Sequence, residues 1–250
     1  PRDLPLVLLV HGGPWARDCW GFQPDVQLLA NRGYAVLQVN FRGSTGYGHD
    51  FAEAGLHRWG LEMQDDLTDA VQWAVDKKIA DPKRVCIVGG SYGGYAALMG
   101  AVKTPDLYRC AVSFAGVGDL IDLWNHKADF IGGEDVWNGM IGNAWRDRER
   151  LRATSPALQA ERIKAPVLLV HGTADRIVPY EQSEDMAKAL RKAGKQHQFI
   201  TLEEGDHYLS RNSHSLTFFK ALESFLAQHI GAGSGENKAV TRSAGASVTP

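Results

Sequence analysis

The sequence is poor in cysteine. Its 250 residues include only Cys19, Cys86 and Cys110, and their spacing is not that of a zinc site. Two of the three lie in apolar, strand-like runs, where cysteine behaves as a small hydrophobe. We therefore expect buried thiols, and the odd number of cysteines does not decide between an oxidising and a reducing compartment.

Long apolar runs and a strong net charge are also missing. No run approaches the roughly 20 apolar residues that span a bilayer, so we expect no membrane segment. The formal charge is -2 and the basic residues are spread along the chain. This gives no electrostatic reason to expect nucleic acid or an anionic membrane as a partner.

The sequence begins at Pro1, with no initiator methionine and no signal peptide pattern. We therefore expect a fragment or a mature form. The cellular location stays open between cytoplasmic, periplasmic and secreted.

What is present is the composition of a soluble globular protein, with 44% hydrophobic and 22% charged residues. A chain of this length suits one α/β domain around a single sheet, which we place at residues 1–230. Residues 231–250 are rich in glycine, serine, alanine and threonine without periodicity. We expect a disordered tail there.

Short apolar runs alternate with segments of helical periodicity along the chain. The expected strands are 6–10, 34–39, 85–88, 110–114, 167–170 and 198–202, and the expected helices are 24–31, 61–78, one opening after residue 91, 180–192 and 216–229. A turn is expected at Asp81-Pro82. Regularity is lost over 118–163, where we expect short helices that overhang the site. The alternation predicts a mostly parallel sheet with helices on both faces and a site at the carboxyl ends of its strands.

One of those strand ends carries a serine between glycines. Gly89-x-Ser91-x-Gly93 follows a β-branched run and opens a helix-compatible segment. A sharp turn from strand to helix strains the backbone of its central residue, and only small residues two positions before and after leave room for it. The pattern predicts an exposed serine hydroxyl at a helix N-terminus, where developing negative charge is favoured.

A serine nucleophile needs a base to take its proton and a carboxylate to orient that base. Two later strand ends supply these groups, Asp175 after the strand 167–170 and His207 after the strand 198–202. The order serine, aspartate, histidine along the chain is that of the α/β-hydrolase fold. We therefore expect this fold, with Ser91, Asp175 and His207 as the catalytic residues.

Other residues compete for these roles. His11 and His171 also stand at strand ends, where a histidine is more often a hydrogen-bonded supporting group than a base. Asp206 is a second candidate for the orienting acid, although neighbouring residues of an extended segment point apart. Glu203, Glu204 and Asp206 also fit a solvated acidic rim.

The oxyanion of an acyl-transfer intermediate needs two donors. The backbone N–H of Tyr92, the residue after the nucleophile, offers one. The turn after the first strand offers a second through Gly13, because Pro14 has no N–H. The alternative is that the glycines of this turn only shape a tight loop.

Four motifs in the same order resemble the catalytic domain of the prolyl oligopeptidase family. They are HGGPW at 11–15, NFRGSTGYG at 40–48, GGSYGGY at 89–95 and HGTAD at 171–175. The acylaminoacyl-peptidase and dipeptidyl-peptidase branches are the most similar, and the resemblance covers about residues 5 to 230. It implies Ser91 as nucleophile, Asp175 as acid and His207 as base.

Two features depart from the family pattern. Some members place a tyrosine hydroxyl in the oxyanion hole at the position of His11, so this chain is expected to use the backbone N–H of Gly13. Members usually carry a β-propeller ahead of this domain, which limits entry to short peptides. We expect that propeller, and the first strands of the full fold, to be missing from this chain.

The resemblance implies a serine peptidase that cuts short peptides, of the oligo-, acylaminoacyl- or dipeptidyl-peptidase type, through an acyl-enzyme on Ser91. A carboxylesterase is the first alternative, because the same triad hydrolyses esters. An inactive interaction domain of the hydrolase fold is the second. No cofactor and no metal is expected, and a homo-oligomer is left open.

The substrate pocket is the least defined feature. An apolar pocket for the residue before the scissile bond is expected to draw on Tyr92 and Tyr95 and on the segment 117–124, with Leu120, Leu123 and Trp124. Ordinary core packing is an equal alternative for Leu120 and Leu123.

Overall fold

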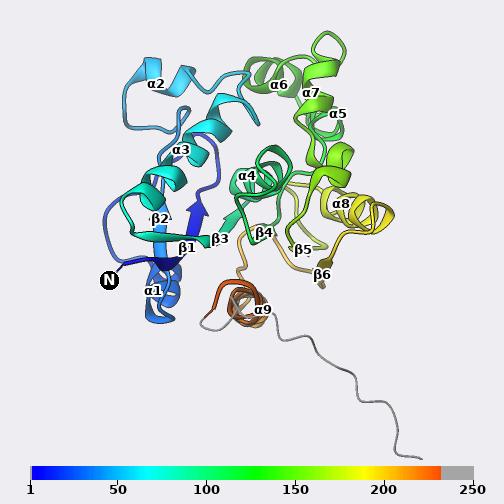
Figure 1. The fold of residues 1–250 in the computed structure, drawn as a ribbon. Helices are drawn as coiled ribbons and strands as arrows, with labels where there is room; N and C mark the ends of the chain where they lie inside the picture. Colours follow the sequence, from blue (N-terminus) through cyan, green and yellow to red (C-terminus); the bar gives the residue numbers. More distant parts are fainter. Residues whose placement is uncertain (1, 232–250) are drawn as a thin grey trace, which may run out of the picture.

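The central element of the computed structural model is a six-stranded sheet in which every pair of neighbouring strands is parallel (Figure 1). Residues 2–231 are described. The strands lie in the order β2-β1-β3-β4-β5-β6. Their bounds are β1 Leu4–Val10, β2 Ala35–Gln38, β3 Ala80–Gly90, β4 Cys110–Phe114, β5 Val167–Gly172 and β6 His197–Leu202. The predicted parallel sheet of the α/β-hydrolase fold is confirmed. The tail predicted at 231–250 lies, apart from Gly231, outside the described residues.

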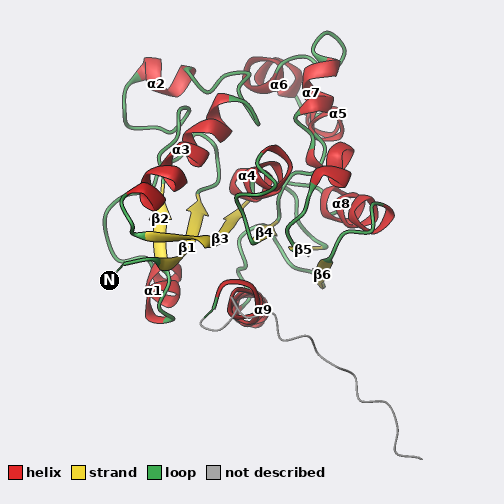
Figure 2. Cartoon of the chain, in the orientation of Figure 1, coloured by secondary structure: helices red, strands yellow, loops and turns green. Residues whose placement is uncertain are grey.

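Helices cover both faces of this sheet (Figure 2). Their bounds are α1 Pro24–Asn31, α2 His49–Glu53, α3 Glu62–Asp76, α4 Tyr92–Lys103, α5 Leu120–Ala128, α6 Gly133–Ile141, α7 Arg148–Ala153, α8 Glu181–Lys192 and α9 Asn212–Ile230. Helices α1 and α9 lie on one side, and α3, α4 and α8 lie on the other. The connections from strand to helix therefore leave the carboxyl ends of the strands along one edge.

Alternate strand residues feed two separate apolar cores, because successive side chains of a strand point to opposite faces. Leu6 and Leu8 of β1 join the core under α3 and α4, while Val7 between them joins the core under α1 and α9. All five residues of β4 are buried. This two-sided burial explains why the strands appear in the sequence as continuous apolar runs.

The segment 118–163 forms short helices, as expected. It contains α5, α6 and α7, followed by a 3-10 helix at Pro156–Arg162. In Figure 1 α5, α6 and α7 lie together at the upper right, beyond α4.

The prediction of a turn at Asp81-Pro82 was wrong. Strand β3 starts at Ala80 and runs through the predicted turn at Asp81-Pro82. Its pairing with β1 shifts register between Leu4 and Leu6, so an irregularity inside the strand accommodates the turn-forming residues. Asp81 keeps a local role there, since its carboxylate accepts from the Lys83 N–H at 2.9 Å.

The prediction of three buried thiols was also wrong. Cys86 of β3 and Cys110 of β4 form a disulfide, and Cys19 is exposed. Cys86 and Cys110 are direct partners in the register of the two strands. An apolar run predicts burial of a cysteine but not the pairing of two strands, so the sequence pattern alone did not reveal the bond.

Among residues 2–231, no helix combines the length and the apolarity needed to cross a bilayer.

Candidate active site

Ser91 occupies a sharp turn between β3 and α4. Its backbone lies at φ 57° and ψ -121°, a left-handed conformation that is unfavourable for a side chain. The neighbouring glycines make the turn possible. A Cβ on Gly93 would collide with the carbonyl oxygen of Val10, and one on Gly89 would collide with the backbone of Gly93. The Ser91 N–H donates to the Phe114 carbonyl at 2.9 Å, which ties the turn to β4.

His207 and Asp175 are joined by a hydrogen bond. Asp175 follows β5 and His207 follows β6, and Nδ1 of His207 lies 2.7 Å from Oδ2 of Asp175. The Asp175 side chain is fully buried and that of His207 is 8% exposed. Because a carboxylate only accepts, Nδ1 carries the proton, and Nε2 of a neutral imidazole is left to accept one.

Asp175 is held by further donors. Its Oδ1 accepts from the N–H groups of Ile177 at 2.8 Å and Val178 at 2.9 Å. Its Oδ2 lies 3.2 Å from Nε2 of His171. Burial acts to raise the pKa of Asp175, but the hydrogen bonds from His171, His207 and the two N–H groups outweigh it and hold this pKa well below 3.8. The carboxylate is therefore ionised at neutral pH.

Ser91 and His207 line one pocket of about 350 Å³. The other lining residues are Gly12, Gly13, Gly90, Phe114, Ile177 and Tyr208. The loop after β1 comes close to the nucleophile turn, since a Cβ on Gly12 would lie 3.3 Å from the Gly90 oxygen and 3.4 Å from the Ser91 Cβ. The structure thus brings together residues from the ends of β1, β3, β5 and β6.

Two residues are predicted as oxyanion donors, and they lie at the pocket and at the start of the helix that follows Ser91. Tyr92 is the first residue of α4 and directly follows Ser91, where no preceding turn of helix supplies an acceptor for its N–H. Gly13 lines the pocket and has φ 116°. Their role as oxyanion donors stays a prediction.

The predicted substrate-binding residues lie elsewhere. Tyr95, Leu120, Leu123 and Trp124 are all buried in the core under α3 and α4, and none lines the pocket of Ser91. The Tyr95 hydroxyl donates to the Thr154 carbonyl at 2.8 Å. Their packing agrees with the alternative weighed for Leu120 and Leu123, and substrate contact by any of the four stays a prediction.

The sequence reasoning missed Phe114, Ile177 and Tyr208 as lining residues. Tyr208 is 74% exposed and Ile177 is 43% exposed, and the Tyr208 ring lies edge-on to that of His207 with 5.3 Å between centroids. In the sequence, Tyr208 directly follows His207 and Ile177 is two residues after Asp175. These positions could have indicated that the two side chains lie near the site. Phe114 is placed by its register opposite Gly90.

The competing residues have other partners. His11 stacks on Phe41 with 4.4 Å between ring centroids, and its Nε2 lies 3.0 Å from the Ser44 hydroxyl. The carboxylate of Asp206 accepts from the N–H groups of Tyr208 and Ser210, both at 3.1 Å.

His171 is fully buried and its two nitrogens have defined roles. Its Nδ1 lies 2.7 Å from the Ser183 hydroxyl. Its Nε2 lies 3.0 Å from the Val178 carbonyl, in addition to its contact with Asp175. Both partners of Nε2 only accept, so Nε2 carries the proton and supports Asp175.

No group of three or more metal-ligating side chains of the kinds His, Cys, Asp and Glu converges within the described part of the chain.

Comparison with known proteins gives a consistent set of relatives. Residues 20–233 match the model of the prolyl oligopeptidase family. Over 238 residues the chain is 42% identical to dipeptidyl aminopeptidase BIII of Pseudoxanthomonas mexicana, covering 91% of this chain and 34% of that protein. It is 37% identical over 230 residues to dipeptidyl peptidase family member 6 of Caenorhabditis elegans, covering 90% and 31%.

Solved structures agree. A puromycin-hydrolyzing peptidase of Mycobacterium tuberculosis superposes with a TM-score of 0.87 at 32% identity, over 92% of this chain and 35% of that one. The acylaminoacyl peptidase of Pyrococcus horikoshii gives a TM-score of 0.86 at 29% identity, over 93% and 38%. The chain spans about a third of the length of these relatives. With the family model matched over most of its length, this chain belongs to the prolyl oligopeptidase family of peptidases.

Proposed function

We propose that this chain hydrolyses short peptides as a serine peptidase, through an acyl-enzyme on Ser91. The observation that carries the proposal is the single pocket lined by Ser91 and His207, in which Asp175 fixes the tautomer of the imidazole through a hydrogen bond of 2.7 Å. The left-handed turn at Ser91 and the hydrogen bond from its N–H to Phe114 hold the nucleophile at the N-terminus of α4.

The proposed mechanism assigns one task to each group. The Ser91 hydroxyl attacks the scissile carbonyl carbon while Nε2 of His207 takes its proton, and the ionised Asp175 stabilises the imidazolium. The oxyanion accepts from the N–H groups of Tyr92 and Gly13, each donor contributing about 3 kcal/mol in the transition state. His207 then protonates the leaving amine, and water releases the acyl group by the same steps in reverse order.

The substrate class follows from the relatives. Those named above are dipeptidyl and acylaminoacyl peptidases and a puromycin-hydrolyzing peptidase. We extend to this chain only what these share, the hydrolysis of an amide bond close to an amino-terminal residue. The activity and substrate range of a longer protein containing this chain are part of the same proposal.

The test compares amide and ester substrates. We expect release of p-nitroaniline from dipeptidyl and aminoacyl p-nitroanilides, and loss of this activity in Ser91→Ala. Hydrolysis of p-nitrophenyl esters without any anilide cleavage would favour a carboxylesterase, the alternative that uses the same three residues.

A further inference from the structure

The pocket of Ser91 has an aromatic side to which the proposed mechanism assigns no task. Phe114 and Tyr208 both line this pocket of about 350 Å³, together with Gly90. The two rings come from different parts of the chain, Phe114 from the end of β4 and Tyr208 from the loop between β6 and α9. We call this lining the aromatic wall, defined by Gly90, Phe114 and Tyr208.

Phe114 is held by contacts on several sides. It is 8% exposed, and its ring centroid lies 5.3 Å from that of Phe218 in α9. Its carbonyl oxygen accepts from the Ser91 N–H at 2.9 Å. Gly90 is its partner in the strand register, and a Cβ on Gly90 would lie 3.4 Å from Cδ1 of Phe114. Because Gly90 has no side chain, it leaves the Phe114 ring accessible from the pocket that both residues line.

Tyr208 is exposed, but its backbone is fixed. It is 74% exposed, and its ring lies edge-on to that of His207 with 5.3 Å between centroids. The Asp206 carboxylate accepts from the N–H groups of Tyr208 and Ser210, both at 3.1 Å. Leu209 packs against the core under α1 and α9. Because these contacts hold the turn, a ligand that packs on the Tyr208 ring has little backbone to order.

The aromatic wall lies on the side of the sheet from which His207 enters the site. Phe114, Phe218 and Leu202 belong to the core under α1 and α9, and His207 follows the strand that ends at Leu202. Tyr92, whose N–H is the proposed oxyanion donor, belongs to the opposite core. In the proposed mechanism the carbonyl oxygen therefore turns towards α4 and the leaving nitrogen towards His207. The amine component of the substrate is then the part that lies along the aromatic wall.

We propose that the aromatic wall binds the amine component of the peptide and selects one with an aromatic side chain. The inference rests on the proposed function and specifies its substrate, since the residue after the scissile bond is the one that is selected. Its ring packs against Tyr208 and Phe114 in the offset or edge-on arrangement that aromatic pairs prefer. The cavity of about 350 Å³ is of the size that binds small ligands.

The same wall receives an amine that attacks the acyl-enzyme. The lone pair of the amine nitrogen forms a bond to the acyl carbon, Nε2 of His207 takes a proton from this nitrogen, and the Ser91 oxygen leaves with that proton. The product is an amide in place of the acid that water gives. Because the acyl part is the same for every amine, the share of amide reports how well each amine binds at the wall.

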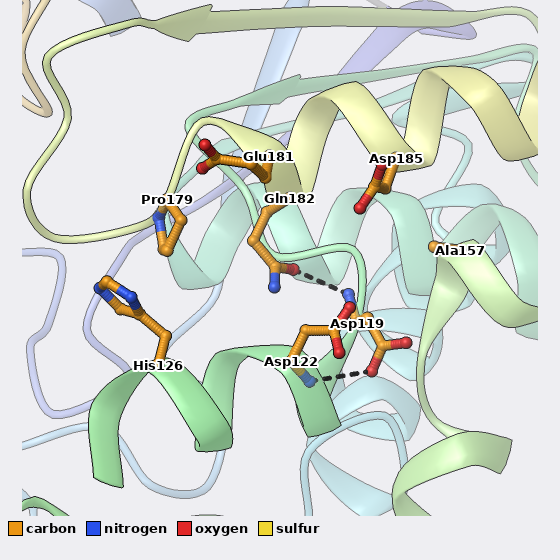
Figure 3. A pocket seen from close by; sticks show the side chains of 8 residues that line it. All are labelled: Asp119, Asp122, His126, Ala157, Pro179, Glu181, Gln182 and Asp185. Carbon is orange, nitrogen blue, oxygen red and sulfur yellow. Dashed lines mark hydrogen bonds between the residues drawn. The ribbon is translucent and has the colours of Figure 1, made fainter. Parts of the chain in front are cut away.

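Two other cavities differ from this pocket in their lining. The cavity between α5 and α8, of about 300 Å³, is lined by acidic side chains that include Asp119, Asp122 and Asp185 (Figure 3). It attracts any cationic amine, so a comparison of two amines of equal charge cancels its contribution. A cavity of about 450 Å³ is lined by Phe130, which is also exposed. Phe130 is therefore a matched aromatic control for Tyr208.

The first test is an NMR titration of the Ser91→Ala protein with phenylalaninamide and with alaninamide, which carry the same charge and differ by a phenyl ring. We expect phenylalaninamide to bind about tenfold more tightly. The added substitution Tyr208→Ala removes this difference, whereas Tyr208→Phe keeps the ring and the difference. The control Phe130→Ala leaves the ratio of the two affinities unchanged.

The second test assigns the wall to the amine component. The acyl-enzyme is formed from N-acetylalanine p-nitrophenyl ester in the presence of each amine, and the amide and acid products are measured per concentration of unprotonated amine. We expect phenylalaninamide to capture the acyl group about tenfold more efficiently than alaninamide, and Tyr208→Ala to abolish this preference. A displaced His207 slows both amines alike, so structural damage alone leaves the preference unchanged.

The outcomes separate the proposal from the proposed function. Equal affinities for the two amines, or the same ratio of affinities in Tyr208→Ala and Phe130→Ala, would overturn the proposal. A preference that depends on Tyr208 in the titration but not in the products would place the ring on the acyl side and would overturn it as well. Absence of ester hydrolysis would contradict the proposed function instead, while the titration needs no turnover and still decides whether the aromatic wall binds the ring.

Discussion

Asp175 and Asp122 are two carboxylates with opposite surroundings. Asp175 is fully buried, yet four donors hold its pKa well below the ordinary value. Asp122 is only partly buried, and its pKa is raised, first by that burial and then by the like charges of Asp119 and Asp185. The difference teaches that hydrogen-bond donors decide whether burial raises the pKa of a carboxylate here: four donors outweigh the burial of Asp175, whereas burial is the main influence on Asp122.

The chemistry of the two regions follows from this difference. The Asp175 carboxylate is satisfied within the protein, so it can orient His207 without moving. The Asp122 carboxylate lies beside the like charges of Asp119 and Asp185, so its ionised form is less favourable. Three expected outcomes test this comparison, and a fourth tests the turn at Ser91.

The largest effect is expected for Asp175→Asn. An amide at this position keeps the shape but donates where the carboxylate accepts, which places the His207 proton on the wrong nitrogen. We expect kcat for a p-nitroanilide to fall about 10⁴-fold with the fold intact. Circular dichroism controls for folding, and a loss of less than tenfold would contradict the role of Asp175 as orienting acid.

Removal of the His171 donor tests how much the support of Asp175 matters. In His171→Asn the amide is too short to reach Asp175 but can still meet Ser183, whereas His171→Gln can place its N–H near the position of Nε2. We expect kcat/KM to fall about tenfold in His171→Asn, as for one charge-assisted hydrogen bond, with partial recovery in His171→Gln. Equal values for the two variants would show that His171 acts only through packing.

The turn at Ser91 gives a prediction on folding. Gly93→Ala would force the new Cβ against the Val10 carbonyl oxygen. We expect a loss of about 2 kcal/mol or more in the free energy of unfolding, measured by urea denaturation. Gly139→Ala in α6 is the matched control, because a Cβ there meets no atom within 4 Å. Since alanine favours a helix over glycine, this variant should not lower the free energy of unfolding.

The smallest effect is expected for Asp122→Asn on stability. Because the folded-state pKa of Asp122 is raised, its ionised form is less favourable in the folded protein than in the unfolded chain. The variant should therefore melt about 1 °C above the wild type at pH 7. The gap should close as the pH falls below 3.8, the ordinary pKa of an aspartate, since both side chains are then neutral.

Much of the fold was predictable because burial on both faces of a parallel sheet leaves continuous apolar runs in the sequence. The loops that carry Ser91, Asp175 and His207 were predictable for a related reason. Each loop follows such an apolar run, and the carboxyl ends of parallel strands lie at the same edge of the sheet. The hydrogen bond between Asp175 and His207 confirms that these two loops meet.

Features that depend on packing between distant segments were not predictable. Phe114 enters the pocket of Ser91 through its register opposite Gly90, and Cys86 meets Cys110 through the same pairing of strands. Asp122 and Gln182 share a cleft only because α5 packs beside α8. Neither periodicity nor spacing in the sequence encodes such neighbours.

The most direct test of the central claim is intact-mass measurement after treatment with a fluorophosphonate probe, in the wild type and in His207→Ala. The account predicts one equivalent of label on Ser91 in the folded wild type and a rate of labelling at least about 100-fold lower in His207→Ala. No labelling of the wild type, or equal rates in the two proteins, would contradict it and favour an inactive domain of the hydrolase fold.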